Sequence, residues 1–348
     1  MKKNISMQTI ADKIGVTKVT VHRALNNRPG VSEVLRAEIL QCANEMGYRI
    51  MKPDHNYSGI SNIAYIVPQH FLLEHERFYS KIYGYLKDIC TSCKINLKMY
   101  LISNKEEEEA KIPSEIIIEN YSGVFFAGFV SNKIVTDAIS KNIPVVLIDY
   151  FHRLLQADSI LSDNYYMGYL ATCHLIEKGH KNIGFVGDYI NVPNITDRCL
   201  GLQKALYEYH LPINNKNYII NDNFKTGLYT LNFELPSPLP TAFVCYCDMA
   251  AYYLYEKLKL RGLTVPQDVS IISFDNTETA VNMSPKLTSI YSSRREFADL
   301  AFKQMINRIK NPSIAPKKWL IPSKIVVRDS IRDLHDYSNN DVNSITTP

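Results

Sequence analysis

MQTIADKIGVTKVTVHRALN, residues 7–26, is the stretch that decides the fold of the N-terminal part of this chain. Apolar residues recur at helical spacing on both sides of Gly15, and Thr17 is well placed to cap the second helix. The stretch predicts two short helices joined by a turn that contains one glycine. RPGVS at 28–32 and the pair Gly47-Tyr48 bracket a third helix. This pattern is a helix-turn-helix, which indicates DNA binding.

The second helix is expected to turn its N-terminal part outward, because Val21, Ala24 and Leu25 face the core. Lys18 and Arg23 can then donate to guanine, and Val19 can contact a thymine methyl group. Short polar side chains beside them suit phosphate oxygens. The residues expected to contact DNA are Thr17, Lys18, Val19, Thr20, His22, Arg23 and Asn26. The alternative is a three-helix bundle whose outward charges only solvate its surface.

The net positive charge of the chain is confined to the helix-turn-helix end. The whole sequence of 348 residues carries 39 Lys and Arg against 35 Asp and Glu. Residues 1–60 hold nine basic and five acidic side chains, and the remainder is balanced. A small basic head on a neutral body is what contact with phosphates requires. The length fits one small and one large domain.

Composition and motifs argue against several other classes of protein. No apolar run is long enough to span a membrane, and the N-terminus lacks the apolar segment of a secretory signal, so we expect a cytoplasmic protein. The seven cysteines are scattered, and we expect buried, reduced thiols. A metal or redox role is the alternative, and we expect no cofactor. A nucleophile–base pair, a phosphate-binding loop and metal-ligand spacing are all lacking, so an enzyme is not expected.

Residues 61–332 alternate apolar strands with amphipathic helices. The expected strands are 63–67, 95–102, 124–126, 145–148, 183–186, 218–220, 243–245 and 269–274, and the expected helices are 79–89, 132–141, 166–178, 196–209 and 249–261. Two successive series of this kind predict two doubly wound lobes, with a ligand cleft at the carboxyl ends of their strands. We therefore expect a head at 1–48, a linker at 49–60, a two-lobe domain at 61–332 and a disordered tail at 333–348.

A series of distinct short motifs is spread over about 330 residues, far beyond the head. They are TIA at 9–11, GVT at 15–17, VTV at 19–21, RALN at 23–26, SDN at 162–164, GYLAT at 168–172, IGFVG at 183–187, Arg198 with Gly201, VPQDVS at 265–270, SFD at 273–275 and LTSI at 287–290. In these motifs the chain resembles the lac-repressor (LacI/GalR) family of bacterial transcription regulators.

The resemblance implies an all-α helix-turn-helix head joined to an α/β two-lobe sensor that is similar to periplasmic binding proteins and has two doubly wound parallel sheets. It also implies a homodimer that binds double-stranded, near-palindromic operator DNA. A small effector between the lobes would alter their closure and shift the heads. The implied function is transcriptional regulation, with repression as the expected direction and no contact with a membrane.

The family's effector contacts transfer to five positions of this sequence. Arg198 matches the effector-binding arginine, Asp275 the aspartate that accepts from effector hydroxyls, and Asp163 a polar position of the cleft. Phe78 and Tyr79 match an aromatic pair beside the ligand. Each has a structural alternative: Arg198 in an internal ion pair, Asp275 as a loop cap, Asp163 as the cap of the next helix, and the aromatic pair in the core.

Two segments depart from the family pattern. The linker, KPDHNYSG at 52–59, is about two residues shorter than usual, and its Asn, Ser and Gly residues oppose the family's hinge helix. The family's Asn-Asp pair is Cys247-Asp248 in this chain, which removes one polar contact for an effector. A sugar or sugar derivative is the expected effector, with a purine or nucleoside as the alternative. A solute-binding module that regulates no gene is the competing class of function.

Overall fold

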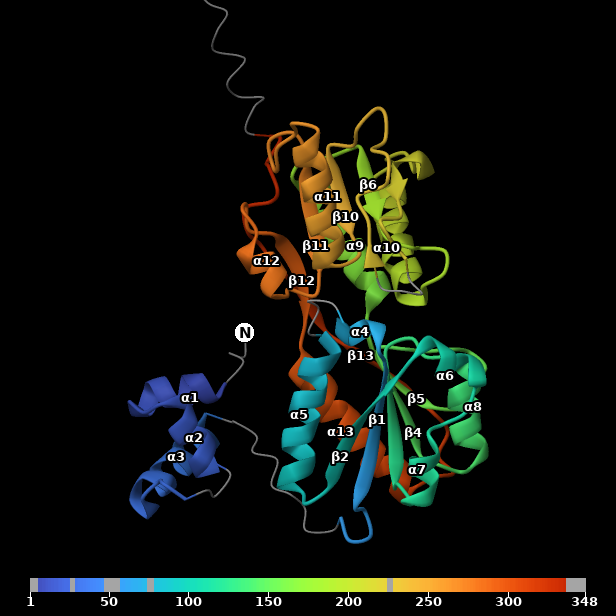
Figure 1. The fold of residues 1–348 in the computed structure, drawn as a ribbon. Coiled ribbons are helices and arrows are strands. Elements are labelled where there is room, and N and C mark those ends of the chain that lie inside the picture. The colour runs from blue at the N-terminus through green and yellow to red at the C-terminus, as the bar shows by residue number, and fades with distance from the viewer. Residues whose placement is uncertain (1–5, 26–28, 47–56, 74–77, 224–227, 336–348) are drawn as a thin grey trace, which may run out of the picture. The chain divides into compact units, whose positions relative to one another are not determined.

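The computed structural model describes residues 6–25, 29–46, 57–73, 78–223 and 228–335. These residues fall into two compact units, one of residues 1–59 with 91–94 and one of residues 60–90 with 95–348 (Figure 1). Within the described part, no helix is both long and apolar enough to cross a membrane. The predictions for Asn26, for residues 49–56 of the linker and for residues 336–348 of the tail concern residues outside the described ranges.

The described residues of the head form three helices, as predicted. They are α1 (Met7–Ile14), α2 (Lys18–Leu25) and α3 (Glu33–Glu45). Ser6 starts α1 with a capping box, in which its hydroxyl accepts from the backbone N–H of Thr9 at 3.1 Å. Gly15 ends α1 with a φ of 77°, a left-handed conformation that glycine adopts without strain. Ile10, Val21, Ala24 and Ile39 are buried between the helices and form their small core.

Arg36 on α3 holds the C-terminus of α2 in place. Its Nη1 donates to the carbonyl oxygens of Arg23 at 3.3 Å and Ala24 at 3.1 Å. These carbonyls belong to the last turn of α2, where no helical N–H is available to them. The arginine is only 8% exposed, so these bonds form in a partly apolar environment. Sequence reasoning did not identify this contact.

The larger unit contains two lobes, each built on a six-stranded sheet. The N-lobe sheet runs β13 (Lys318–Ile321), β5 (Asp158–Ser162), β4 (Val145–Ile148), β3 (Gly123–Ala127), β1 (Asn62–Pro68) and β2 (Asn96–Ile102). The C-lobe sheet runs β14 (Ser323–Val326), β12 (Thr288–Ser292), β11 (Ser270–Phe274), β10 (Ala242–Cys245), β6 (Ile183–Val186) and β7 (Tyr218–Ile219). All neighbours pair in parallel except β12 with β14.

Helices cover both sheets, as expected of doubly wound lobes. The N-lobe has α4 (His70–Leu73), α5 (Phe78–Ser92), α6 (Asn104–Glu109), α7 (Ser114–Ile118), α8 (Asn132–Ser140) and α13 (Arg294–Lys310), and the C-lobe has α9 (Asn164–Glu177), α10 (Pro193–Glu208), α11 (Asp248–Leu260) and α12 (Glu278–Asn282). A short 3-10 helix, Asn215–Asn217, precedes β7, and a hairpin of β8 (Asp222–Asn223) and β9 (Leu228–Tyr229) follows it. Alternate residues of β10, such as Phe243 and Val244, enter the apolar clusters on opposite faces of the C-lobe sheet.

The two predicted lobes are confirmed, but the two successive series of strands and helices do not complete them. After β12 the chain returns to the N-lobe, where α13 packs on β3, β4 and β5 and β13 pairs with β5. It then enters the C-lobe again as β14. The lobes are therefore joined by three crossings, at Asp163, Ser293 and Pro322. β13 was not predicted. It is an edge strand whose first three residues are exposed, and it therefore lacks the apolar run that is typical of a buried strand.

Helices α9 and α10 touch through two glycines that belong to the motifs singled out above. A Cβ atom on Gly168 would lie 1.9 Å from the carbonyl oxygen of Arg198. A Cβ atom on Gly201 would lie 2.0 Å from the carbonyl oxygen of Tyr165. Both neighbours are backbone atoms of the facing helix, so no side-chain rotation can make room. This contact fixes the position of α10, and with it the position of Arg198.

We expect Gly201→Ala to lower the free energy of unfolding of the two-lobe unit by about 3 kcal/mol, because the added methyl group forces α9 and α10 apart. Gly84→Ala is the matched control, because a Cβ atom on Gly84 in α5 meets nothing within 4 Å. That control should gain up to about 1 kcal/mol from better helix propensity. Urea unfolding followed by circular dichroism measures both. Equal stability of the two variants would contradict the close contact.

Candidate nucleic-acid interface and effector cavity

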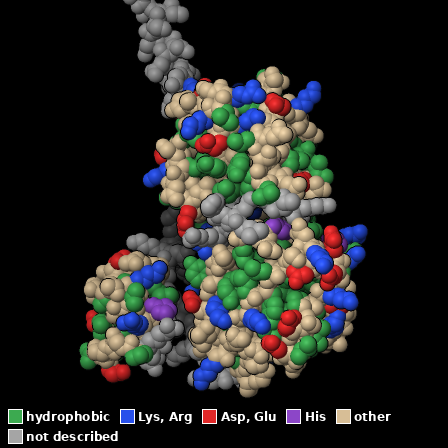
Figure 2. Space-filling view, viewed as in Figure 1, with side chains coloured by type: hydrophobic (Ala, Val, Ile, Leu, Met, Phe, Trp, Pro, Cys, Tyr) green, Lys and Arg blue, Asp and Glu red, His purple; other side chains and the backbone are tan. Residues whose placement is uncertain are grey.

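The N-terminal part of α2 is presented to solvent. Thr17 caps the helix by accepting from the N–H of Thr20 at 3.1 Å, and their hydroxyls lie 2.9 Å apart. Lys18 and Arg23 are exposed, and the side chain of Val19 is 60% exposed although it is apolar. His22 is half-buried. Basic and histidine side chains are visible on the face of the head in Figure 2.

The larger unit holds a cavity of about 130 Å³ between the carboxyl ends of its two sheets. This is close to the roughly 150 Å³ of an engineered protein cavity that accepts benzene, so a single six-membered ring is the scale of ligand that fits. Its lining is rich in aromatic rings and contains three carboxylates and one guanidinium. The lining residues are His70, Phe71, Phe78, Tyr79, Phe129, Asp149, Tyr150, Val192, Pro193, Asn194, Ile195, Arg198, Asp222, Tyr229, Tyr246, Cys247 and Asp275.

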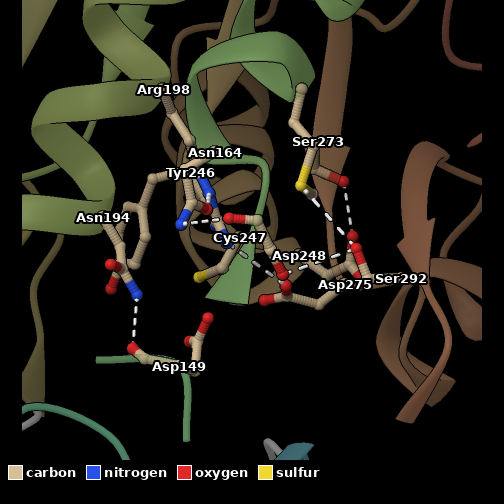
Figure 3. A network of polar contacts seen from close by, with 12 residues as sticks. Asp149, Asn164, Asn194, Arg198, Tyr246, Cys247, Asp248, Ser273, Asp275 and Ser292 are labelled. Atoms are coloured by element: carbon tan, nitrogen blue, oxygen red, sulfur yellow. Dashed lines mark hydrogen bonds and ion pairs between the residues drawn. The ribbon is translucent and has the colours of Figure 1, made fainter. Parts of the chain in front are cut away.

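Arg198 extends from α10 into the network of polar contacts at the C-lobe wall (Figure 3) and is 6% exposed. Its Nε donates to Oδ1 of Asn164 at 2.8 Å, and its Nη1 donates to the carbonyl oxygen of Tyr246. Its Nη2 lies 3.8 Å from Oδ1 of Asp275, and its guanidinium carbon lies 4.7 Å from the centroid of the Phe274 ring. Arg198 thus lines the cavity and also makes the internal ion pair that was the structural alternative.

Asp275 follows β11 directly, with a φ of 91° that few non-glycine residues adopt. Its N–H donates to the carbonyl of Ile290 at 2.8 Å, and its own carbonyl accepts from Arg294. These backbone bonds hold the residue in a conformation that costs free energy, which is common where a ligand binds. Its carboxylate faces Arg198 and the cavity.

The turn that follows Asp275 is held by a second, fully buried carboxylate, Asp248. Its Oδ2 accepts from the N–H of Thr277 at 2.6 Å and from the Thr277 hydroxyl at 2.9 Å. Its Oδ1 accepts from the hydroxyls of Ser289, at 2.7 Å, and Ser273. Burial raises the pKa of Asp248 to about 6, and repulsion by Asp275 adds to the rise. Asp248 therefore acts on the cavity through the position of Asp275.

Asp149 is the carboxylate of the N-lobe wall. It follows β4, has a φ of 56° and is 7% exposed. Its Oδ2 accepts from the Tyr79 hydroxyl at 3.1 Å, and its carbonyl accepts from Asn194 Nδ2 at 2.8 Å, a bond between the lobes. Burial raises its pKa to about 6 although Arg198 acts to lower it. In the described structure its Oδ1 is buried without a hydrogen-bond partner.

The predicted aromatic pair lines the cavity and also packs inside the protein. Tyr79 donates to Asp149, and its ring lies 5.0 Å from that of Phe71. Phe78 is 8% exposed, and its ring meets Phe297 edge-on at 5.7 Å. Phe78 thus has features of both an effector contact and a core residue, the two roles considered for it.

Asp163 is the one predicted effector residue that the structure places outside the cavity lining. Its Oδ1 accepts from the N–H of Tyr166 at 3.1 Å and caps α9, which is the structural alternative. The next residue, Asn164, reaches Arg198 instead. Four of the five predicted residues, namely Phe78, Tyr79, Arg198 and Asp275, are therefore brought together.

Sequence reasoning missed several side chains of the cavity, including Asp149, Asn194, Asp222, Tyr229 and Tyr246. A usable signal existed for two of them, because Asp149 follows β4 and Tyr246 follows β10 at the carboxyl ends of parallel strands. No such signal existed for Asp222 and Tyr229, because the short hairpin that carries them has no apolar run.

Cys247 stands where the family pattern has the Asn of its Asn-Asp pair. Its Sγ accepts from the N–H of Ala250 at 3.3 Å and caps α11, and the Tyr229 hydroxyl lies 3.1 Å from it. All seven cysteines lie in the described part of the chain, where none forms a disulfide, and six of them are buried. Among the described residues, no group of three or more His, Cys, Asp or Glu side chains is arranged to hold a metal.

Comparison with known families assigns both parts of the chain. Residues 6–50 match the model described as bacterial regulatory proteins, lacI family. Residues 172–331 match the model described as a periplasmic binding protein-like domain.

Similar proteins match over nearly the full length. The HTH-type transcriptional repressor PurR of Vibrio campbellii is 24% identical, over 95% of this chain and 99% of that protein. Catabolite control protein A of Priestia megaterium is 25% identical, over 94% of this chain and 100% of that protein. A solved complex of the transcriptional regulator CelR with cellobiose has the same fold, with a TM-score of 0.69 and 19% identity over 94% of this chain and all of the other.

The exposed helix-turn-helix, the two-lobe domain with its cavity, and the two matching family models agree with one another. The chain belongs to the lacI family of bacterial regulatory proteins.

Proposed function

We propose that this protein represses transcription from a near-palindromic operator and responds to a small carbohydrate bound between its lobes. The observation that carries the proposal is the presence, in one chain, of an exposed basic helix-turn-helix and a buried ligand-sized cavity at the ends of two sheets. Binding DNA and a ligand is the whole of this activity, so the proposal includes no catalytic step. Because its target is genomic DNA, the site of action is the cytoplasm.

In this proposal the head, residues 1–48, reads the operator and residues 61–332 sense the effector. Residues 49–60 connect them, and two copies of the chain bind the two halves of the operator, as the symmetry of such sites requires. Lys18, Val19 and Arg23 contact bases, and Thr17, Thr20, His22 and Asn26 contact the backbone. The exposed position of Val19 supports this assignment, because an apolar side chain at that position gains from a thymine methyl group.

A carbohydrate is supported by the mixture of groups around the cavity. Carboxylates and a guanidinium form strong, charge-assisted hydrogen bonds with hydroxyl groups. Aromatic faces pack against the apolar faces of a sugar ring. The same aromatic lining favours a purine as the second candidate, since rings such as Phe71 and Tyr79 could stack on a base.

Selection of bound sequences from random double-stranded DNA by the full-length protein, at a stated salt concentration, tests the regulatory part of the proposal. We expect enrichment of a near-palindromic motif. Salt-sensitive binding without enrichment would contradict sequence-specific recognition.

We expect Arg23→Ala to weaken operator binding by about 1–3 kcal/mol and to relax the preference at one base position, because a bidentate contact to guanine is lost. Arg23→Lys is the control that keeps the charge without the planar fork of donors. It should restore binding to random DNA but not the base preference. Equal losses on operator and random DNA would assign Arg23 to the phosphates instead.

We expect Arg198→Ala to abolish the response to effector while operator binding persists. The variant removes the donors that hold Asn164, the Tyr246 carbonyl and Asp275 in the C-lobe wall. Operator retention with and without effector measures the response, and circular dichroism checks the fold. A variant that fails to fold would show that the internal contacts of Arg198 are its main role.

Asp149→Asn should stabilise the effector-free protein at neutral pH. The raised pKa, about 6, means that the folded protein binds more protons than the unfolded chain between about pH 4 and pH 6, so this carboxyl makes stability fall as pH rises through that window. Above it the ionised group costs on the order of 3 kcal/mol, which the amide avoids. Thermal unfolding at pH 5 and pH 7.5 should show a gain for the variant that is larger at pH 7.5. A gain that is the same at both pH values would contradict this origin.

A further inference from the structure

The charges of the described lining residues are unbalanced. Among the described lining residues, Asp149, Asp222 and Asp275 carry carboxylates and Arg198 carries the guanidinium. We propose that the effector carries a protonated amino group that binds to Asp222, and that its class is therefore an amino sugar of monosaccharide size. The inference rests on the proposed function for the existence of an effector and specifies its chemistry.

The positive charge of Arg198 already acts on the other two carboxylates, those of Asp275 and Asp149. It lies 3.8 Å from Asp275 and is the positive group that acts to lower the pKa of Asp149. His70 also lines the cavity, but burial lowers the pKa of its imidazole, which favours the neutral form. Asp149 and Asp275 are thus partly neutralised by the protein itself.

Asp222 has no such partner in the described structure. Its Oδ2 accepts from the Tyr246 hydroxyl at 2.9 Å, and its Oδ1 is buried without a hydrogen bond. The charged group that acts on it is a second carboxylate, Asp188. Asp188 is 6% exposed and accepts from neutral donors, the N–H groups of Ile190 and Asn191 and the amide of Asn191. Asp222 is a half-buried residue whose Oδ1 is buried, so repulsion from Asp188 is poorly screened there, and a cation beside Asp222 relieves it.

The surroundings of Asp222 suit an ammonium group. Asp222 pairs with Tyr229 across the β8–β9 hairpin, and the hydroxyl of Tyr229 lies 2.8 Å from that of Tyr246. The two tyrosine rings are nearly parallel, at 11°, with their centroids 6.5 Å apart. Aromatic faces next to a carboxylate attract a cation through both charge and the ring quadrupole. A phosphate or carboxylate group on the ligand would be repelled at the same place.

The N-lobe wall of the cavity suits a neutral donor. Asp149 is more than nine-tenths buried, lines the cavity and keeps Oδ1 without a partner in the described structure. Because Arg198 lies close by, a hydroxyl group satisfies this oxygen without a further charge. The two free carboxylate oxygens therefore belong to opposite walls, with Asp149 on the N-lobe and Asp222 on the C-lobe hairpin. A ring that carries hydroxyls and one amine meets both.

Matched ligand sets provide the test. The full-length protein is titrated calorimetrically at pH 7 with glucose, glucosamine and glucose 6-phosphate, and with the corresponding galactose and mannose sets. We expect one amino sugar to bind at least tenfold more tightly than its neutral parent, and its phosphorylated counterpart not to bind. In Asp222→Asn the amino sugar and its parent should bind alike. Asp299→Asn, on the outer helix α13, is the control and should keep the tenfold preference.

Several results would overturn the proposal. They are a neutral or phosphorylated sugar that binds as tightly as its amino counterpart, a preference for the amine that survives in Asp222→Asn, and a lack of binding by every amino sugar. Operator selection with the same Asp222→Asn protein separates this proposal from the proposed function. Enrichment of the operator motif together with any of these results rejects only the amino sugar, whereas loss of the motif from the unmodified protein rejects the regulatory function itself.

Discussion

The ligand-binding unit depends on one buried guanidinium, that of Arg198. Its Nε and Nη1 donate to Asn164 at the start of α9 and to the backbone after β10, and its Nη2 lies 3.8 Å from the carboxylate after β11. A single side chain therefore joins three segments that are distant in the sequence. The planar fork of an arginine suits this task, whereas a lysine would offer one compact charge. The close approach of α9 and α10 through Gly168 and Gly201 places the guanidinium at that junction. The packing of α9 against α10 therefore also determines where the positive charge of the cavity lies.

The cavity holds its acids at a cost to stability. Burial raises the pKa of both Asp149 and Asp248 to about 6, so each is less stable in its ionised form than in water. Asp275 adds a left-handed backbone conformation that its neighbours enforce. A protein selected for stability alone would replace such groups. The Oδ1 of Asp149, which has no hydrogen bond in the described structure, fits a site whose missing hydrogen bond is supplied by a ligand.

The lobes are joined so that a ligand in the cavity can bias their closure. Three crossings connect them, and Asn194 of the C-lobe donates to the backbone of Asp149 in the N-lobe. A ligand that contacts both Asp149 and the C-lobe wall binds the closed arrangement better than an open one, and by linkage it shifts that equilibrium. The helical head has its own core and its own arginine, Arg36, at the end of α2, so its fold does not require the ligand.

The sequence by itself determined the helix-turn-helix and the alternation of strands and helices, because these depend on local spacing and capping. Its resemblance to a family, carried by short motifs, indicated four of the lining residues. These four residues are Phe78, Tyr79, Arg198 and Asp275. The tertiary structure decided that Asp163 caps a helix while Asn164 meets Arg198, and that β13 returns to the N-lobe. It also decided that the β8–β9 hairpin brings Asp222 and Tyr229 to the cavity. These outcomes depend on contacts between residues up to about 160 positions apart, such as the pairing of Ser159 with Lys318, which no local pattern records.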